Sequence, residues 1–263
     1  MSKIVFLHSQ SPRSGHNFMA EVIRLLIDCA SPLGKTSEIP LAGTLDFINK
    51  TFKTHHPSAQ ADSYIRDLLL KDLRVSILEN QTQNVLIKYT SFAGVEFLKE
   101  QFPNDYHLLL IRDPRDVLVS QFKAKRNNDL KHLTKRLLYP FGVYHFSYSR
   151  KYSKSILSAL SNLNEMTFFT YEDLVEKDTS TLEKLIDLFG ANLSVKALSE
   201  AMDAIEIINT SFYKEETLAE KLWESSPKTK QFKPIHRTKG FNKLQLFGIV
   251  LGSHEIRKKL GYI

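Results

Sequence analysis

The order of short apolar runs and helical patterns constrains the fold of this 263-residue chain more than any other feature. Four apolar runs have the length and composition of buried strands: Ile4–His8, Asn84–Thr90, Leu108–Ile111 and the first part of Met166–Val175. Apolar residues recur at helical spacing in five segments: residues 18–30, Ala59–Glu79, Phe92–Phe102, the stretch after Pro114, and Thr181–Phe189. Because strands that alternate with helices form a parallel sheet covered on both faces, this order predicts an α/β fold.

The remaining segments indicate whether the chain forms one domain or several. Ser31–Pro57 contains three prolines and no clean period, so we expect an irregular segment there. No internal repeat, low-complexity tract or linker interrupts the chain, and we predict one domain over residues 1–263.

Composition narrows the class of protein. Lys and Arg outnumber Asp and Glu by 36 to 29, and this net charge of +7 suits an anionic ligand as well as a merely basic protein. Cys29 is the only cysteine, which excludes an intrachain disulfide and favours a reducing compartment. No apolar run approaches the roughly 20 residues of a membrane span, and the first strand leaves no room for a signal peptide. We therefore expect a cytoplasmic protein.

Polar clusters follow the predicted strands at the points where the strands end. They are Ser11–Asn17, Lys88–Thr90, Arg112–Asp116 and Tyr171–Asp173. Ligands of open α/β sheets bind outside the carboxyl ends of the strands, beside helix N-termini. We therefore expect these clusters to surround one ligand cleft.

The first cluster, SPRSGHN, has the composition of a phosphate-binding loop. Gly15 lets the backbone approach an anion closely, and the N–H groups that start the next helix can face it. Arg13 adds a guanidinium suited to phosphate or sulfate oxygens. An ordinary turn before a helix has a similar composition. The sequence contains no G-x-x-x-x-G-K-[ST] pattern, which argues against an ordinary ATP-dependent kinase.

The third cluster is a second candidate anion site. Arg112 ends a strand, and Ser120 lies eight residues later on the helix that follows. Pro114 suits the first turn of that helix, and Asp113 can cap it. In the alternative interpretation, the four charged residues of Arg112–Asp116 only neutralise one another at the surface.

Taken together, these loops resemble the sulfotransferases that use 3′-phosphoadenosine 5′-phosphosulfate (PAPS). PRSG resembles the family's loop for the 5′-phosphosulfate, and IRDPRDVLVS resembles its 3′-phosphate motif. The block NVLIKYTSFAGVEFLKEQFPNDYHLLLIRDPRD resembles the segment that brings a lysine, here Lys88, to the sulfuryl site. TYEDLV matches the Tyr-Glu-x-Leu segment, and KKLGY resembles a common final segment.

The resemblance implies a P-loop NTPase-like sulfotransferase fold, PAPS as sulfuryl donor and no required metal. It also implies a set of cofactor-binding residues: Arg13, Ser14, Gly15, His16, Asn17, Arg112, Ser120 and Tyr171, the last near the adenosine. HRTKGFNKL (residues 236–244) resembles the basic loop that closes over the 3′-phosphate, which adds Arg237, Lys239 and Gly240. A basic surface turn has a similar composition.

Sulfuryl transfer needs cations over the developing charge and a base for the acceptor proton. Arg13 and Lys88 suit the first role. Cytosolic members of the family carry their base in a Lys-Thr-His-x-Pro segment, whereas tyrosylprotein sulfotransferases use a glutamate beyond the first loop. This chain has no histidine directly after Lys88, but KTHHP occurs at residues 53–57, and Glu38 lies 25 residues after Arg13. We predict His55 as the base, with Glu38 close behind.

The acceptor is expected to be a small molecule, glycan or peptide that bears a hydroxyl or amine, and no nucleic-acid partner is expected. Ser31–Pro57 and residues 127–161 are expected to shape its pocket. The basic patches at 123–128 and 131–136 would guide an anionic acceptor or form solvated helix faces. Two alternatives to a sulfotransferase are an atypical P-loop nucleotide kinase and a non-catalytic polyanion-binding protein. The sequence specifies neither the acceptor nor the oligomeric state.

Overall fold

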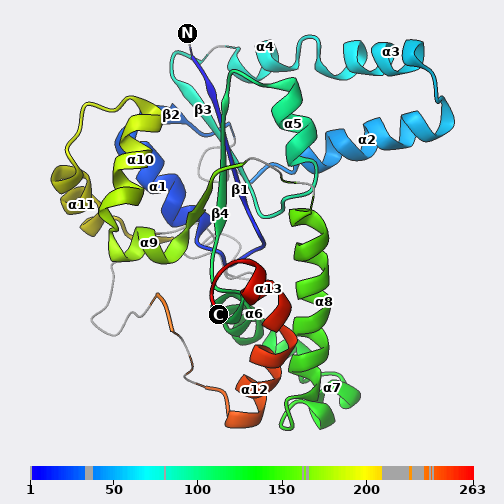
Figure 1. Ribbon diagram of the computed structural model, residues 1–263, viewed down its shortest axis with the longest axis vertical. Helices are drawn as coiled ribbons and strands as arrows, with labels where there is room; N and C mark the ends of the chain where they lie inside the picture. Colours follow the sequence, from blue (N-terminus) through cyan, green and yellow to red (C-terminus); the bar gives the residue numbers. More distant parts are fainter. Residues whose placement is uncertain are drawn as a thin grey trace.

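A five-stranded sheet lies at the centre of the protein (Figure 1). The structure is a computed structural model, and it describes residues 2–32, 38–79, 81–161, 163, 166–208, 225–226, 234–236, 238 and 240–263. The strands pair in the order β2-β3-β1-β4-β5, and every pair is parallel. Their bounds are β1 Ile4–Ser9, β2 Cys29–Ala30, β3 Asn84–Tyr89, β4 Tyr106–Ile111 and β5 Phe168–Thr170. The predicted α/β class with a parallel sheet is therefore confirmed.

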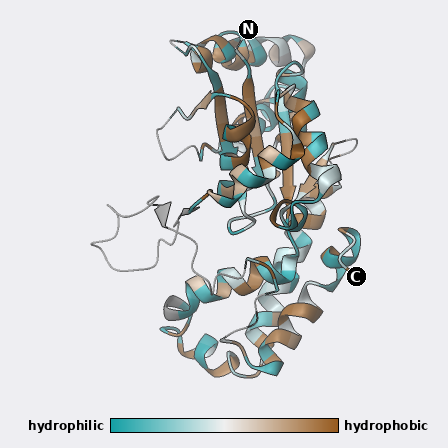
Figure 2. Cartoon of the chain, turned by 90° about the vertical axis from the view of Figure 1, so that its left-hand side faces the viewer, coloured by the Kyte–Doolittle hydropathy of each residue, from teal (hydrophilic) through white to brown (hydrophobic). Residues whose placement is uncertain are grey.

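The central strand β1 shows why these runs are continuously apolar. All six of its residues are buried, since helices cover both faces of the sheet. Val5 and Leu7 pack on one face, against α1 (His16–Leu26), α9 (Tyr171–Glu176), α10 (Thr179–Phe189) and α11 (Val195–Asp203). Ile4 and Phe6 pack on the other, against α2 (Leu41–His55) and α5 (Val95–Gln101). Figure 1 shows the two layers, and the strands are predominantly brown in the hydropathy colouring of Figure 2.

A helical layer lies at one end of the sheet, in the lower half of Figure 1. It consists of α6 (Pro114–Asp129), α7 (Leu133–Leu138), α8 (Val143–Leu160), α12 (Lys243–Gly252) and α13 (His254–Lys259). Helices α8 and α12 approach closely because α12 presents glycines: a Cβ at Gly248 would lie 2.3 Å from the carbonyl oxygen of Gly142. No helix among the described residues combines the length and apolar composition needed to cross a bilayer.

Three sequence-based expectations about elements were wrong. The segment predicted to be irregular contains the 15-residue helix α2, whose buried side is only a narrow stripe of Ala42, Leu45 and Asn49. The first helix ends at Leu26, and Cys29–Ala30 instead joins the sheet beside β3. The helix predicted over residues 59–79 is two helices, α3 (Ala59–Leu70) and α4 (Leu73–Leu78).

A short antiparallel pair, β6 (Ile207–Ile208) and β7 (Ser225–Ser226), lies outside the main sheet.

Candidate functional site

The loop after β1 is shaped by contacts that only glycine permits at position 15. Gly15 has φ 92°, and a Cβ there would lie 2.1 Å from the nearest ring atom of Tyr171. It precedes α1 without a side-chain cap. Ser14 is buried, and its hydroxyl donates to the Ser11 carbonyl at 2.8 Å. The amides at the N-terminus of this 11-residue helix, beginning with His16, therefore form the kind of terminus that binds anions.

Arg112 and Ser120 meet the same loop from the neighbouring strand and helix. Nε of Arg13 donates to Oγ of Ser120 at 3.1 Å, and Nη1 of Arg112 donates to the Arg13 carbonyl at 2.8 Å. The Arg112 guanidinium lies 4.5 Å from the centre of the Tyr171 ring. It is almost fully buried, also donates to the Pro234 carbonyl, and has no hydrogen-bond partner for Nε among the described residues. The structure thus brings the two predicted anion sites together.

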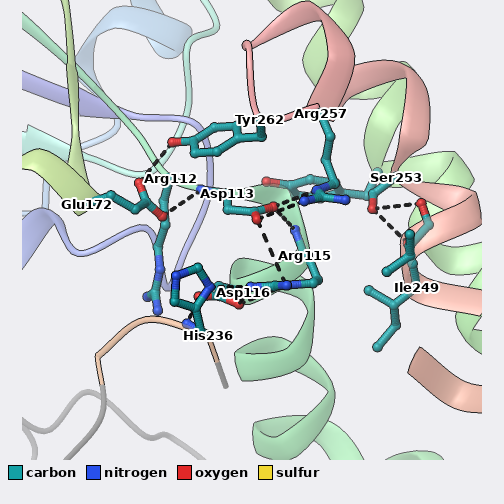
Figure 3. A network of polar contacts seen from close by, with 12 residues as sticks. Arg112, Asp113, Arg115, Asp116, Glu172, His236, Ile249, Ser253, Arg257 and Tyr262 are labelled. Atoms are coloured by element: carbon teal, nitrogen blue, oxygen red, sulfur yellow. Dashed lines mark hydrogen bonds and ion pairs between the residues drawn. The ribbon is translucent and has the colours of Figure 1, made fainter. Parts of the chain in front are cut away.

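The carboxylate of Asp113 faces away from this cluster. It accepts two hydrogen bonds from the Arg257 guanidinium, at 2.9 and 3.2 Å. The backbone N–H of Asp113 donates to Glu172, whose other oxygen accepts from the Tyr262 hydroxyl at 2.8 Å. Figure 3 shows this network, in which residues of α13 and the segment after it reach the ends of β4 and β5. Asp113 and Glu172 therefore have structural partners that hold α13 beside the site.

Arg115 and Asp116 pair with each other, but Asp116 is buried and does not lie at the surface as the alternative interpretation expected. Arg115 lies 3.0 Å from Asp116, and the other oxygen of Asp116 accepts the backbone N–H of His236 at 2.5 Å (Figure 3). Only Arg112 of the charged run therefore faces the first loop. Arg237 and Lys239, predicted beside His236, lie outside the described residues, and Gly240 is exposed with φ 96°.

Lys88 lies deep beneath the loop. Only 1% of it is exposed, and its ammonium donates to the Asn17 side chain at 2.5 Å. Burial lowers the pKa of Lys88 from 10.5 to about 8, and the nearby Glu38 carboxylate opposes this shift. Glu38 lies beside Lys88 because its segment pairs with the end of β3, where the Ile39 N–H donates to the Lys88 carbonyl at 3.0 Å. An ammonium and a carboxylate are therefore adjacent at the sheet edge.

His16 joins this group through Glu38. Its Nε2 lies 2.5 Å from Oε1 of Glu38. Burial lowers the pKa of His16 more than the contact with Glu38 raises it, so the ring is neutral near pH 7 and donates its Nε2 proton. Burial alone would raise the pKa of Glu38, but the hydrogen bond from His16 and the Lys88 charge lower it. Glu38 is therefore ionised, and Nδ1 of His16 is a buried acceptor without a partner among the described residues.

A cavity of about 900 Å³ opens beside Arg13, between α2, α5, α6 and α8. Its walls are polar and aromatic, and they include Asn49 of α2 and Tyr152 of α8, whose hydroxyl accepts from Gln10 at 2.9 Å. The buried Oδ1 of Asn49 has no partner among the described residues. Both segments expected to shape an acceptor pocket contribute to this wall. Of the predicted site residues that the structure describes, only Arg13 lines it.

His55 is one predicted site residue that the fold separates from the loop after β1. It lies at the C-terminal end of α2, exposed, at the end of that helix remote from the sheet in Figure 1. Its neighbour Lys53 does line the cavity. Glu38, in contrast, is in contact with the groups that lie under the loop.

Two residues of the site were missed in the sequence. Gln10 exchanges hydrogen bonds with the backbone of Arg112, at 2.9 and 3.1 Å, and so ties the first loop to the end of β4. Its position directly after the first strand could have indicated that Gln10 belongs to the site. Arg257 was missed because its partner, Asp113, is 144 positions away, a distance that no local pattern reports.

A family model for the sulfotransferase domain matches residues 6–246. The chain belongs to the sulfotransferase family. This assignment makes the protein an enzyme and sets aside the nucleotide kinase and the non-catalytic polyanion-binding protein. A sequence search of curated proteins finds no significant match to this sulfotransferase.

Three of the solved structures that are similar to this sulfotransferase are described as sulfotransferases. The sulfotransferase domain from the curacin biosynthetic pathway is 17% identical with a TM-score of 0.47, and the match covers 100% of this chain and 99% of that one. A mouse sulfotransferase complexed with PAP is 17% identical with a TM-score of 0.41, over 76% of this chain and 64% of that one. A sulfotransferase from Alicyclobacillus acidocaldarius is 12% identical with a TM-score of 0.37, over 84% and 90%.

Proposed function

We propose that this sulfotransferase transfers the sulfuryl group of PAPS to a hydroxyl or amine of its acceptor and releases adenosine 3′,5′-bisphosphate (PAP). The observation that carries the proposal is that Arg13 connects the two candidate anion sites. Its side chain donates a hydrogen bond to Ser120, and its carbonyl accepts one from Arg112. PAPS carries a phosphate at the 3′ position and a phosphosulfate at the 5′ position of the same ribose. Two adjacent cationic sites suit these two anionic groups.

The residues of each site suit different parts of the donor. Arg13 and the backbone from Ser14 to Asn17 would hold the 5′-phosphosulfate at the start of α1. Arg112 and Ser120 would hold the 3′-phosphate, and the Tyr171 ring would lie near the adenosine. The buried Nε of Arg112, a donor with no partner among the described residues, supports this assignment because such groups carry a desolvation cost unless a ligand or water bonds them. The absence of any required metal remains a prediction.

The chemistry forms a bond from the acceptor oxygen to sulfur and breaks the bond from sulfur to the phosphate oxygen. Negative charge develops on that phosphate oxygen, and Lys88 and Arg13 would stabilise it. With a pKa of about 8, Lys88 carries its charge at neutral pH. Glu38 would accept the acceptor proton, and we prefer it to His55 because it is ionised and lies beside Lys88. His16 would orient this carboxylate through its Nε2–H.

The cavity beside Arg13 is our candidate for the body of the acceptor. Its mixed wall of lysines, carboxylates, tyrosines and serines favours a polar acceptor with several hydrogen-bonding groups over a purely apolar one. A hydroxyl-bearing small molecule, glycan or peptide meets that description. A cytoplasmic location, expected from the single cysteine and the lack of a long apolar run, stays part of the proposal.

Calorimetry with PAP in the absence of Mg²⁺ tests the donor site. Arg112→Ala removes one charged hydrogen-bonding partner and should weaken PAP binding by about 1.5–3 kcal/mol, whereas Ser120→Ala should cost about 0.5–1.5 kcal/mol. Arg115→Ala is the matched control, because this arginine belongs to the same run but pairs with Asp116. Wild-type PAP affinity in Arg112→Ala, or AMP bound as tightly as PAP, would refute the assignment. A transfer screen with radiolabelled PAPS across acceptor classes then identifies the acceptor.

A further inference from the structure

Positive charge is concentrated in the helical layer. Residues 117–164 and 240–263 together contain 13 Lys and Arg but only two acidic residues, Asp129 and Glu255, a net charge of +11. Since the whole chain has a net charge of +7, all remaining residues together carry −4. One end of the molecule is therefore a strongly cationic body on an otherwise slightly anionic protein.

The same layer exposes large apolar side chains along α12. This helix packs on α8 through its buried residues Gln245, Gly248, Ile249 and Gly252. Leu244, Phe247 and Leu251 project from the opposite side and are all more than half exposed. Their spacing of three and four positions places them on one face of the helix. A surface helix normally carries polar residues on its outer face, so this stripe is unusual.

The stripe continues onto the segment between α7 and α8 and onto the first residue of α8. The Asn242 side chain donates to the Pro140 carbonyl at 3.0 Å, and Gly142 packs against the Leu244 backbone. Phe141 is 66% exposed and Val143 is half exposed, so both extend the apolar stripe. We refer to Phe141, Val143, Leu244, Phe247 and Leu251 as the apolar face.

The α7 helix brings further apolar and basic groups to the same end of the molecule (Figure 1). Leu133, Leu137 and Leu138 are exposed there beside exposed basic residues of the KHLTKR patch. Among the described residues, eight of the fifteen large exposed apolar side chains lie within 133–143 and 244–251. Such a grouping marks an interaction site more often than a solvated surface.

We propose that the apolar face docks on the surface of an anionic lipid bilayer. Exposed Leu and Phe side chains bordered by Lys and Arg are the pattern of interfacial membrane binding, in which the apolar groups enter the headgroup region and the cations meet anionic lipids. The charge distribution argues against a second copy of the chain, because two bodies of +11 repel each other. A soluble polyanion would need the cations but not the apolar face. This docking does not depend on which acceptor the enzyme uses.

Vesicle co-sedimentation of the full chain tests the proposal. The protein should bind vesicles that contain phosphatidylserine and should bind pure phosphatidylcholine vesicles far more weakly. Phe247→Ser with Leu251→Ser should lower the affinity for the anionic vesicles by about tenfold or more. The matched control is Leu68→Ser with Val75→Ser, two exposed apolar residues of α3 and α4, which should leave vesicle binding unchanged.

A charge variant provides an independent measurement that does not alter the apolar face. Lys131→Gln with Arg136→Gln should weaken binding about fivefold for each lost cation, and added salt should reduce this effect. The control is Lys196→Gln on α11, outside the helical layer, which should leave vesicle binding unchanged.

Three results would overturn the proposal. One is wild-type protein that fails to bind anionic vesicles. Another is binding that the Phe247/Leu251 variant retains in full, which would indicate simple polyanion binding. The third is a dimer, detected by ultracentrifugation, that the same variant dissociates while wild-type protein does not bind vesicles.

Discussion

Substitution of Lys88 by methionine separates what this buried ammonium costs the fold from what it contributes to the reaction. Burial lowers the pKa of Lys88 from 10.5 to about 8. A difference of about 2.5 pKa units means that holding the charged form in the folded protein costs about 3 kcal/mol near pH 7. Methionine has a similar length and no charge, so it removes this cost. The lost hydrogen bond to Asn17 offsets about 1.5–3 kcal/mol of the gain, and we expect the variant to be about 1 kcal/mol more stable at pH 7.

The pH dependence of this difference is the sharper measurement. Between pH 8 and 10.5 the unfolded chain holds a proton on Lys88 that the folded protein has released, so the stability of the wild type rises with pH in this window. The stability of the variant relative to the wild type should therefore fall by about 2 kcal/mol between pH 7 and pH 9.5, so that the variant becomes about 1 kcal/mol less stable than the wild type at pH 9.5. Urea unfolding of both proteins at the two pH values measures it.

The activity of the Lys88→Met variant should fall, although its stability at pH 7 should rise. Lys88→Met should lower kcat more than it weakens PAPS binding, because the ammonium would act mainly on charge that develops during the reaction. Equal losses in turnover and binding would point to a ground-state binding role. A variant that is less stable than the wild type at pH 7, with no dependence of the difference on pH, would contradict the inferred cost of burying the Lys88 charge.

Four further substitutions test the site and its supports. Glu38→Gln should lower turnover by about 10²–10⁴-fold with PAP affinity retained, and His55→Ala should not; the reverse result would return the base to His55. Gly15→Ala should prevent the loop from forming, because the added Cβ overlaps the Tyr171 ring and φ is 92°, so near-wild-type thermal stability and PAP binding would disprove this packing of the loop on the ring. Tyr262→Phe should lower the free energy of unfolding by about 1–2 kcal/mol in chemical denaturation, and an unchanged value would mean that the network around Arg257 tolerates its loss.

The local sequence was sufficient for four of the five strands of the sheet, all except β2, and for the meeting of the anion-binding loops. Strands buried on both faces must be continuously apolar, and β1 and β4 have this pattern. The polar groups that follow parallel strands must meet at one edge, which brings Arg13, Arg112 and Ser120 together. These properties follow from neighbours in sequence and from the handedness of the chain, so they could be predicted without tertiary contacts.

Tertiary structure decided the rest. Helix α2 has too narrow an apolar stripe to produce a clear period, and this stripe is buried only because α5 and the sheet cover it. We prefer Glu38 to His55 as the base because of tertiary structure. Strand pairing places Glu38 beside Lys88, whereas helix α2 carries His55 away from the sheet. The bond from Arg257 to Asp113 joins residues 144 positions apart. Periodicity in a sequence reports which side of one element is buried, but which elements then face each other is settled by the packing of the whole chain.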